Sequence, residues 1–315
     1  MLTLVLLFVA GIALLYVGAE ALVSGASGLA LKMGIRPLIV GFTIIAMGTS
    51  SPELAVSMIS AVQGTKGIAL GNIIGSNIAN IALVIGIAAI IRPLEIRINT
   101  IRREMPYLIF TTGLFYLLSL DGVIGFYDGL ILLVGFTAFI LYMIRLAQKD
   151  RKDGSQFYDD IPQTRRQRPM WNNLVFIVLG LAGLVIGSTL MVDSAKQIAL
   201  QMGISEVIIG ISLVALGTSL PELAISAVGA ARGEVDLAVG NAVGSNLFNI
   251  LFVIALVAMV SPIPVSPELL RFDYIFMLGL TIAFLPMMIH KFKITRLEGV
   301  FLVAVYVVYI GLIYR

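Results

Sequence analysis

The chain has 315 residues, of which 59% are hydrophobic, only 12% are charged and none is cysteine. Because a soluble globular domain carries about twice that charged fraction, the composition indicates an integral membrane protein. The lack of cysteine excludes disulfide frameworks and thiolate metal sites, and the single histidine, His290, excludes a metal site built from several histidines.

Hydropathy predicts ten membrane-spanning helices, since a helix needs about 20 apolar residues to cross a bilayer. We expect the first to be a retained span rather than a cleaved signal peptide, because no Lys or Arg precedes Lys32 and its apolar run is too long. In chain order, the expected spans are residues 3–29, 38–63, 68–91, 105–120, 127–146, 172–195, 207–231, 236–260, 271–290 and 297–314.

One long stretch of the sequence occurs twice. Gly41–Ile81 aligns with Gly210–Ile250 without a gap and with 20 identities, so a single constant shift, the repeat offset, relates equivalent positions. Each half then holds five spans, and because five is an odd number, the second half enters the membrane from the opposite side. We therefore predict an all-α membrane protein with ten transmembrane helices in two inverted five-helix repeats, residues 1–147 and 171–315, joined by a cytoplasmic connector at 148–170.

The positive charge of the chain tests this topology. With both termini placed outside, the loops predicted to lie inside hold 17 of the 21 Lys and Arg residues, as the positive-inside rule requires. The net charge of +3 therefore reflects cytoplasmic loops and does not indicate nucleic-acid binding. We expect a plasma (inner) membrane location. The acidic pair Asp159–Asp160 is too small a cluster for a regulatory ion site, so the connector is interpreted as a solvated linker.

Two further acids, Glu20 and Asp193, lie in the first and sixth expected spans but do not align with each other. We interpret both as structural or pathway residues. Aligned small residues in the same spans, such as Gly18 and Gly187, suit helices that slide along a core.

The repeated motif Gly-Thr-Ser-X-Pro-Glu carries the chemistry, at Gly48–Glu53 and at Gly217–Glu222. A proline removes one amide donor and clashes with the carbonyl four residues back, which frees carbonyls around Ala46–Thr49 and Ala215–Thr218. Free carbonyls within a membrane need a polar cavity, and hard cations prefer oxygen ligands. The expected side-chain ligands in this motif are Thr49, Ser50, Thr218 and Ser219, with Glu53 and Glu222 supplying the charge.

The simpler interpretation is a proline kink in which Ser and Thr hydroxyls hydrogen-bond the helix again. It would explain one copy of the motif, but it explains two copies poorly, because an acidic side chain at membrane depth is costly. No Lys or Arg lies inside a neighbouring expected span to neutralise Glu53 or Glu222. A bound cation or a proton is therefore expected to do so.

A second repeated motif covers Gly71–Asn80 and Gly240–Asn249. Its GxxxG spacing allows close helix packing, and its asparagines could form hydrogen bonds between helices. The Ser and Asn four residues apart in each copy share one helix face, and we favour them as oxygen ligands. They are Ser76, Asn80, Ser245 and Asn249. Both roles stay open for Asn72, Asn77, Asn241 and Asn246.

The segments GTSSPE and GTSLPE, each followed by GNIIGSNIANI or GNAVGSNLFNI, resemble the sodium/calcium exchangers of the calcium/cation antiporter superfamily, in their prokaryotic, short-loop form. The resemblance implies five helices per repeat and ion sites midway across the membrane that open alternately to each face. It centres the calcium site on Glu53 and Glu222. It adds the backbone carbonyls of Ala46, Thr49, Ala215 and Thr218 and the side chains of Thr49, Ser50, Ser76, Asn80, Thr218, Ser219 and Ser245. Some relatives carry Asp at the position of Asn249, which leaves ion number and potassium dependence open.

We therefore predict an antiporter that exchanges Ca²⁺ for Na⁺ across the lipid bilayer by alternating access, with no cofactor and no nucleic-acid partner. A Ca²⁺/H⁺ exchanger using the same two Glu residues, a K⁺-dependent exchanger and a passive channel are the alternatives, and the oligomeric state is not assigned. A membrane enzyme is less favoured, because the sequence has no HExxH motif and no Cys motif.

Overall fold

The computed structural model describes residues 2–64, 66–98, 100–152, 169–202 and 217–313, and nearly all of them are helical. The first half contains α1 (Leu2–Met33), α2 (Pro37–Val40), the π-helical η1 (Gly41–Ile45), α3 (Ala46–Thr49), α4 (Ser51–Val62), α5 (Lys66–Ala79), the π-helical η2 (Asn80–Val84), α6 (Ile85–Ile91), the π-helical η3 (Thr100–Glu104), α7 (Met105–Leu118) and α8 (Phe126–Lys152).

The second half contains α10 (Met170–Gln201), α12 (Leu220–Ala231), α13 (Val235–Phe248), the π-helical η4 (Asn249–Ile254), α14 (Ala255–Val260), α15 (Pro267–Arg271), α16 (Asp273–Ile289), the 3-10 helix η5 (His290–Phe292) and α17 (Arg296–Ile313). Two short antiparallel ladders join the halves. One pairs β1 (Leu94–Glu95) with β4 (Lys293–Ile294), and the other pairs β2 (Val123–Ile124) with β3 (Ile263–Pro264).

Seven helical segments are long and apolar enough to cross a membrane, and α2–α4 makes an eighth if its two arms, bent by 41°, are one span. These match eight of the ten expected spans. The expected span 105–120 corresponds to α7, a 14-residue helix that directly follows η3 with its charged residues Arg102, Arg103 and Glu104. The expected span 207–231 lies partly outside the described residues, and its described part is α12. The chain is an integral, multi-pass membrane protein.

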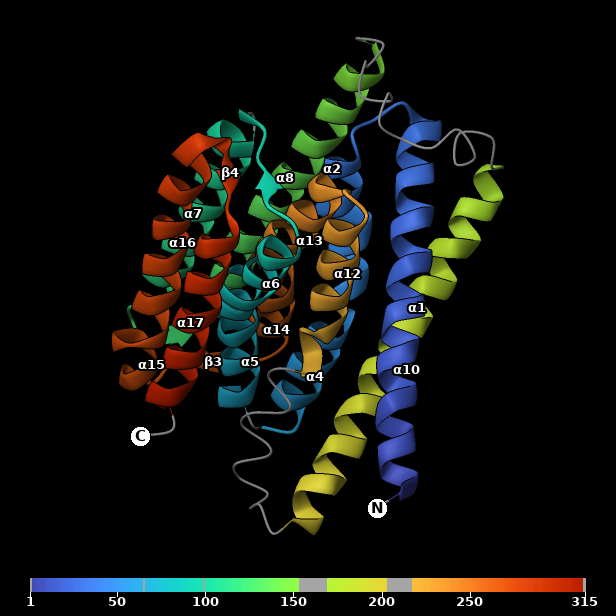
Figure 1. Ribbon diagram of the computed structural model, residues 1–315. Helices are drawn as coiled ribbons and strands as arrows, with labels where there is room; N and C mark the ends of the chain where they lie inside the picture. Colours follow the sequence, from blue (N-terminus) through green and yellow to red (C-terminus); the bar gives the residue numbers. More distant parts are fainter. Residues whose placement is uncertain (1, 65, 99, 153–168, 203–216, 314–315) are drawn as a thin grey trace.

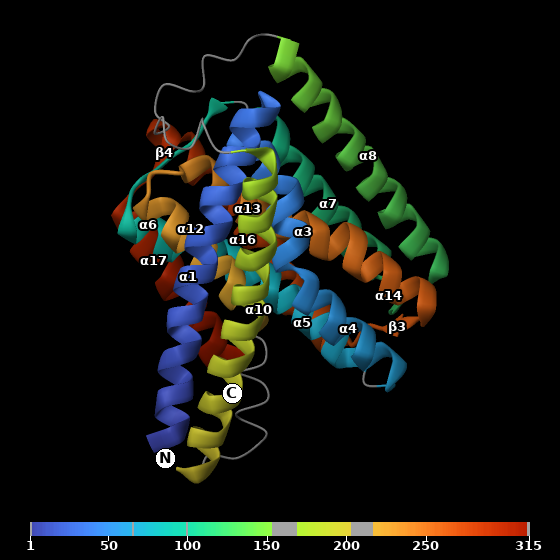
Figure 2. The ribbon, with the colours of Figure 1, turned by 90° about the vertical axis from the view of Figure 1, so that its right-hand side faces the viewer.

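Helices α1 and α10 run side by side and form a layer of their own against the rest of the bundle (Figure 1 and Figure 2). Glycines let the two backbones meet, since a Cβ added at Gly18 would lie 2.8 Å from the backbone nitrogen of Leu184 and one at Gly187 would lie 2.8 Å from that of Leu15. The pairing of Gly18 with Leu184 and of Gly187 with Leu15 makes the helices antiparallel. The start of α1 and the end of α17 lie at the same end of the bundle (Figure 1).

The helices that carry the second motif form the centre of the bundle. In the spans Lys66–Ile91 and Val235–Val260, 78% of the most apolar window is buried, compared with 22% to 33% in the other five. Both central spans contain a π-helical stretch, and the two stretches begin at equivalent residues, Asn80 and Asn249. Because such a stretch widens the helix and is frequent at functional sites, it marks this level of the bundle.

The break in α2–α4 lies at the predicted proline. Helix α3 ends at Thr49, Ser50 leaves the helical region with ψ of 8°, and α4 begins with Pro52 in its first turn. Ser219 has ψ of 1°, and Pro221 occupies the first turn of α12 in the same way. The carbonyl of Gly48 accepts a hydrogen bond from Ser51 Oγ at 2.7 Å, so one freed carbonyl is bonded again by a hydroxyl.

Candidate cation site

The two motif glutamates occupy equivalent places in the fold. Glu53 lies in the first turn of α4 and Glu222 in the first turn of α12, directly after the proline in each case. Both side chains are fully buried. The prolines explain this placement, because each one begins a new helix whose first turn carries the carboxyl group into the centre of the bundle.

Each carboxyl group is hydrogen-bonded through one oxygen only. Oε1 of Glu53 accepts from Ser76 Oγ at 3.4 Å. Oε1 of Glu222 accepts from Ser245 Oγ at 3.3 Å and from Ser50 Oγ, of the other half, at 3.3 Å. The other oxygen, Oε2, is buried without a hydrogen-bond partner in both glutamates. Among the described residues, no Lys, Arg or His forms an ion pair with either one.

The motif threonines connect the two halves. Thr49 Oγ1 lies 3.4 Å from Ser245 Oγ, and Thr218 Oγ1 lies 3.4 Å from Ser76 Oγ. Since Ser76 and Ser245 also bond the glutamates, each Thr–Ser–Glu chain takes its threonine from one half and its serine and glutamate from the other. The repeat offset relates the two chains, so the same contact is made twice.

The asparagines of the second motif have two different roles. Asn80 Nδ2 donates to Asn246 Oδ1 at 3.0 Å, and Asn249 Nδ2 donates to Asn77 Oδ1 at 3.2 Å. These bonds fix the amides of Asn80 and Asn249 and leave their Oδ1 atoms buried with no partner. The contacts favour hydrogen bonding between helices for Asn77 and Asn246, and an available oxygen for Asn80 and Asn249.

The remaining predicted ligands differ in their surroundings. Ser219 Oγ is buried without a hydrogen-bond partner. The carbonyl of Ala46 accepts a hydrogen bond from the backbone nitrogen of Ser50 at 3.0 Å, so part of its capacity is already used. Ala215 lies outside the described residues.

The available atoms define what the site can bind. Two carboxylate oxygens, two amide oxygens and one hydroxyl of the predicted ligands are each buried without a hydrogen-bond partner, and no basic side chain of the described residues forms an ion pair with the two acids. Oxygen atoms of this kind are the ligands that Ca²⁺ and Na⁺ prefer. No group of three or more His, Cys, Asp or Glu in the described ranges is placed to hold a metal, so any ion here depends on neutral oxygens as well as on the two glutamates.

A family model described as "Sodium/calcium exchanger protein" matches residues 3–145 and again residues 172–315. The chain belongs to the sodium/calcium exchanger family. CaxA of Alkalimonas amylolytica, a putative antiporter, is 38% identical over 302 residues, which cover 95% of each chain. Sodium/calcium exchanger MaX1 of Methanosarcina acetivorans is 28% identical over an alignment of 345 positions that covers 98% of each chain.

Solved structures extend the likeness to the fold. A structure of the sodium-calcium exchanger NCX_Mj, soaked with zero Na⁺ and Ca²⁺, matches with a TM-score of 0.85 and 32% identity over 99% of each chain. These relatives are transporters, in agreement with the expectation that the chain is not an enzyme, and membership of this exchanger family supports antiport of calcium and another cation.

Two serines of this exchanger complete the network and were not among the predicted ligands. Thr49 Oγ1 donates to Asn241 Oδ1 at 3.1 Å, and Asn241 Nδ2 donates to Ser226 Oγ at 3.2 Å. In the other half, Thr218 Oγ1 donates to Asn72 Oδ1 at 3.2 Å, and Asn72 Nδ2 donates to Ser57 Oγ at 3.3 Å. The repeat alignment could have identified both serines, because Ser57 and Ser226 are identical residues related by the repeat offset.

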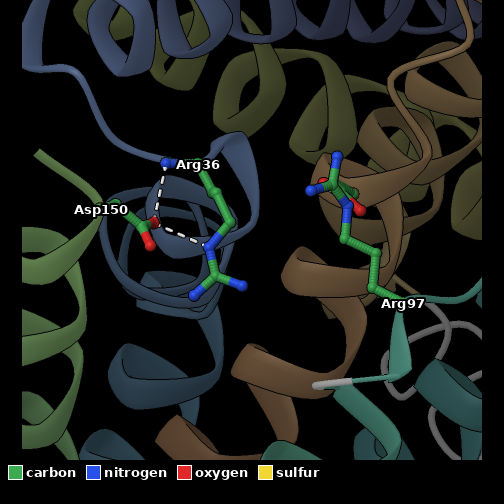
Figure 3. Close-up of polar contacts among 4 residues, drawn as sticks. Arg36, Arg97 and Asp150 are labelled. Atoms are coloured by element: carbon green, nitrogen blue, oxygen red, sulfur yellow. Dashed lines mark hydrogen bonds and ion pairs between the residues drawn. The ribbon is translucent and has the colours of Figure 1, made fainter. Parts of the chain in front are cut away.

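The exchanger also has polar contacts in which an acid is neutralised by a basic partner. Arg36, at the start of α2, holds Asp150 of α8 through Nε at 2.7 Å and through its backbone nitrogen at 3.3 Å (Figure 3). Nearby, Arg97 Nε contacts Asp236 of α13 at 3.0 Å. Because these carboxylates are neutralised by arginine, they do not need a bound cation.

Proposed function

We propose that the chain is a secondary antiporter that exchanges Ca²⁺ for Na⁺ by alternating access, with the ions bound between the two halves at mid-membrane. One observation carries the proposal: Glu53 and Glu222 are fully buried, occupy equivalent positions, and each retains an oxygen with no donor and no basic partner in the described chain. A buried charge requires compensation, and a transported cation supplies it.

The proposed ligands are the two glutamates together with Thr49, Thr218, Ser50, Ser219, Ser76, Ser245, Asn80 and Asn249, and the carbonyls of Ala46 and Ala215. Support differs among them. It is greatest for Glu53, Glu222, Asn80, Asn249 and Ser219, which have a buried oxygen without a partner. It is weaker for the Ala46 carbonyl, which already accepts a hydrogen bond from the backbone nitrogen of Ser50.

The proposed architecture is ten helices in two inverted repeats, 1–147 and 171–315, with a connector at 148–170. In its favour, one family model matches each half separately. The two ladders add support, because β1 and β3 are related by the repeat offset. Strand β4, the partner of β1, lies at the upper end of the bundle, whereas β3 lies at the lower end (Figure 1). Equivalent elements at opposite ends are what an inverted repeat produces.

The proposed orientation places both termini outside a plasma (inner) membrane. The basic side chains favour it, because Arg36, Arg92, Arg97 and Arg232 belong to the predicted cytoplasmic loops, which hold 17 of the 21 Lys and Arg.

Charge counting supplies a stoichiometry for this mechanism. Two glutamates carry −2, so one Ca²⁺ or two Na⁺ leave the site neutral, and a third Na⁺ on neutral oxygens leaves +1. Exchange of three Na⁺ for one Ca²⁺ then moves one net charge, which is worth about 2.3 kcal/mol per 100 mV of membrane potential. A site with two uncompensated charges is hindered from crossing, which couples the two ions.

Uptake of ⁴⁵Ca²⁺ into proteoliposomes, under imposed Na⁺, K⁺ or H⁺ gradients, tests the proposal. We expect an outward Na⁺ gradient to drive uptake and a pH gradient alone to leave it at the background of protein-free vesicles. Uptake driven by the pH gradient alone would replace this proposal with a Ca²⁺/H⁺ exchanger that uses the same glutamates. Equal uptake without any counter-gradient would indicate a channel.

A further inference from the structure

A cleft of about 970 Å³ opens at the end of the bundle where β1 pairs with β4, away from the buried glutamates. Both halves of the chain line it, and five of its lining residues are basic: Arg92, Arg97, Arg232, Lys291 and Lys293. Three are acidic: Glu95, Glu234 and Asp236. The wall is therefore rich in charge, with an excess of positive side chains.

Two of the five basic side chains of the cleft, Arg97 and Arg232, form ion pairs with acids. Arg97 holds Asp236 at 3.0 Å, and Arg232 holds Glu20 of α1 through Nε at 2.8 Å. Lys293 stands opposite Glu95 in the β1–β4 register. Within the described parts of the chain, Arg92 and Lys291 form no ion pair or side-chain hydrogen bond.

The backbone holds both cations in the wall of the cleft. Gly233 has φ of +79°, and a Cβ added there would lie 2.6 Å from Arg92 Nη1, so the guanidinium rests against the bare backbone of this glycine. Lys291 and Phe292 have φ of 58° and 51°. Residues with side chains adopt such values infrequently and at an energetic cost, so the tight turn that presents Lys291 is held by its surroundings.

The charge of the cleft decides which ligands it accepts. Ca²⁺ and Na⁺ are repelled by the excess of basic groups, so the cleft is poorly suited to the exchanged ions. A phosphate group fits, because arginine offers a planar fork of donors to its oxygens and lysine adds a compact charge. Basic pockets at the cytoplasmic ends of membrane helices suit the phosphate of a lipid headgroup for the same reason.

We propose that this cleft is a binding site for a phosphate group, with Arg92 and Lys291 as its two free cations, carried either by an anionic lipid headgroup or by a soluble phosphate compound. The site is separate from the cation site and does not depend on which ion drives exchange.

The test uses the purified full-length protein and two probes. Isothermal titration calorimetry with magnesium-free ATP measures the soluble source, and native mass spectrometry with phosphatidylglycerol against phosphatidylcholine measures the headgroup source. We expect saturable binding of at least one anionic probe, weakened about tenfold or more in the R92Q/K291Q variant, which removes both free cations. Binding of ATP alone assigns the site to a soluble phosphate, and preferential binding of phosphatidylglycerol alone assigns it to a lipid.

The matched control is R145Q/K149Q, which removes the same charge from two exposed residues of α8. We expect it to bind the probe as the wild type does. The proposal is overturned if neither probe binds saturably, if R92Q/K291Q binds like the wild type, or if both double variants weaken binding equally, since that result measures net charge alone. Unchanged thermal unfolding of both variants without probe establishes that a loss of binding is not a loss of folding.

Discussion

Two groups of buried acids in this exchanger differ in what neutralises them. At the end of the bundle, Asp150 is held by the buried Arg36 at 2.7 Å. At the centre, Glu53 and Glu222 have only hydroxyl partners, each on one oxygen, and no basic partner in the described chain. A buried charge without compensation is costly. Asp150 is neutralised by Arg36 within the protein, whereas Glu53 and Glu222 need a cation or a proton from solution.

Burial of an acid alone therefore does not mark an ion site in a membrane protein. Asp150 and Glu53 are both buried, yet of the two only Asp150 has a basic partner among the described residues. Removing a charge should therefore have opposite consequences in the two regions: loss of transport with the fold preserved at the centre, and loss of stability at the end.

The largest expected effect is on transport. Replacing Glu53 or Glu222 by Gln should abolish ⁴⁵Ca²⁺ uptake, because either change removes half of the charge that binds Ca²⁺ while leaving the side chain the same size. The ion-free protein should unfold no more easily than the wild type, since an uncompensated buried charge is gone. Glu268→Gln, at an exposed acid, is the control and should transport normally. Near-normal uptake by E53Q would refute the assignment of the site.

The next effect is on stability. Arg36→Gln leaves Asp150 buried without its partner, and the free energy of unfolding should fall by about 3–5 kcal/mol. Unfolding of the detergent-solubilised protein by SDS measures it. The double variant R36Q/D150N removes both charges and should recover much of the loss, which separates the ion pair from simple packing. A stability of R36Q equal to that of the wild type would show that the pair contributes nothing.

The sequence was sufficient for the parts of the site that local chemistry determines. Proline disfavours a continuous helix by removing a backbone donor, so the interruptions before Glu53 and Glu222 were predictable, and the repeat predicted that both would occur. Eight of the ten expected spans correspond to apolar helices or to a bent pair of them. The ligand assignments themselves remain predictions, supported by the unpartnered oxygens.

Tertiary packing decided what the sequence left open. Asn77 and Asn80 are close together on one helix, and only the packing of α5 and η2 against α13 and η4 makes Asn77 an acceptor for Asn249 and leaves the oxygen of Asn80 free. The π-helical stretches that begin at Asn80 and Asn249 alter the helix register in a way that periodicity does not reveal. The Arg36–Asp150 pair joins residues 114 positions apart, which no local pattern contains.

A smaller effect is the stabilisation of the folded protein by bound Ca²⁺. A ligand that binds only the folded state adds RT ln(1 + [L]/Kd), about 2.7 kcal/mol at a hundred times Kd. Ca²⁺ should therefore raise the thermal unfolding midpoint of the wild type, and a chelator should reverse the rise. R36Q, which starts from a lower midpoint, should gain the same increment because its cation site is intact. A rise of the same size in E53Q/E222Q would place the stabilising ion somewhere other than between the glutamates.

The smallest effect tests the equivalence of the two halves. Ser57→Ala and Ser226→Ala each remove one hydrogen bond from Asn72 or Asn241, the residues that hold Thr218 and Thr49. Such a bond is worth about 0.5–1.5 kcal/mol, so the apparent affinity for Ca²⁺ in flux measurements should fall by a few-fold. The two variants should lower the affinity alike, because the repeat offset relates the bonds to Asn72 and Asn241, although Ser226→Ala also removes a bond from Ser226 Oγ to the carbonyl of Ala238. If only the unfolding midpoint moves and the apparent affinity does not, these serines support the fold without positioning the site. If one variant alone lowers the affinity, the halves share their geometry but not their contribution to ion binding.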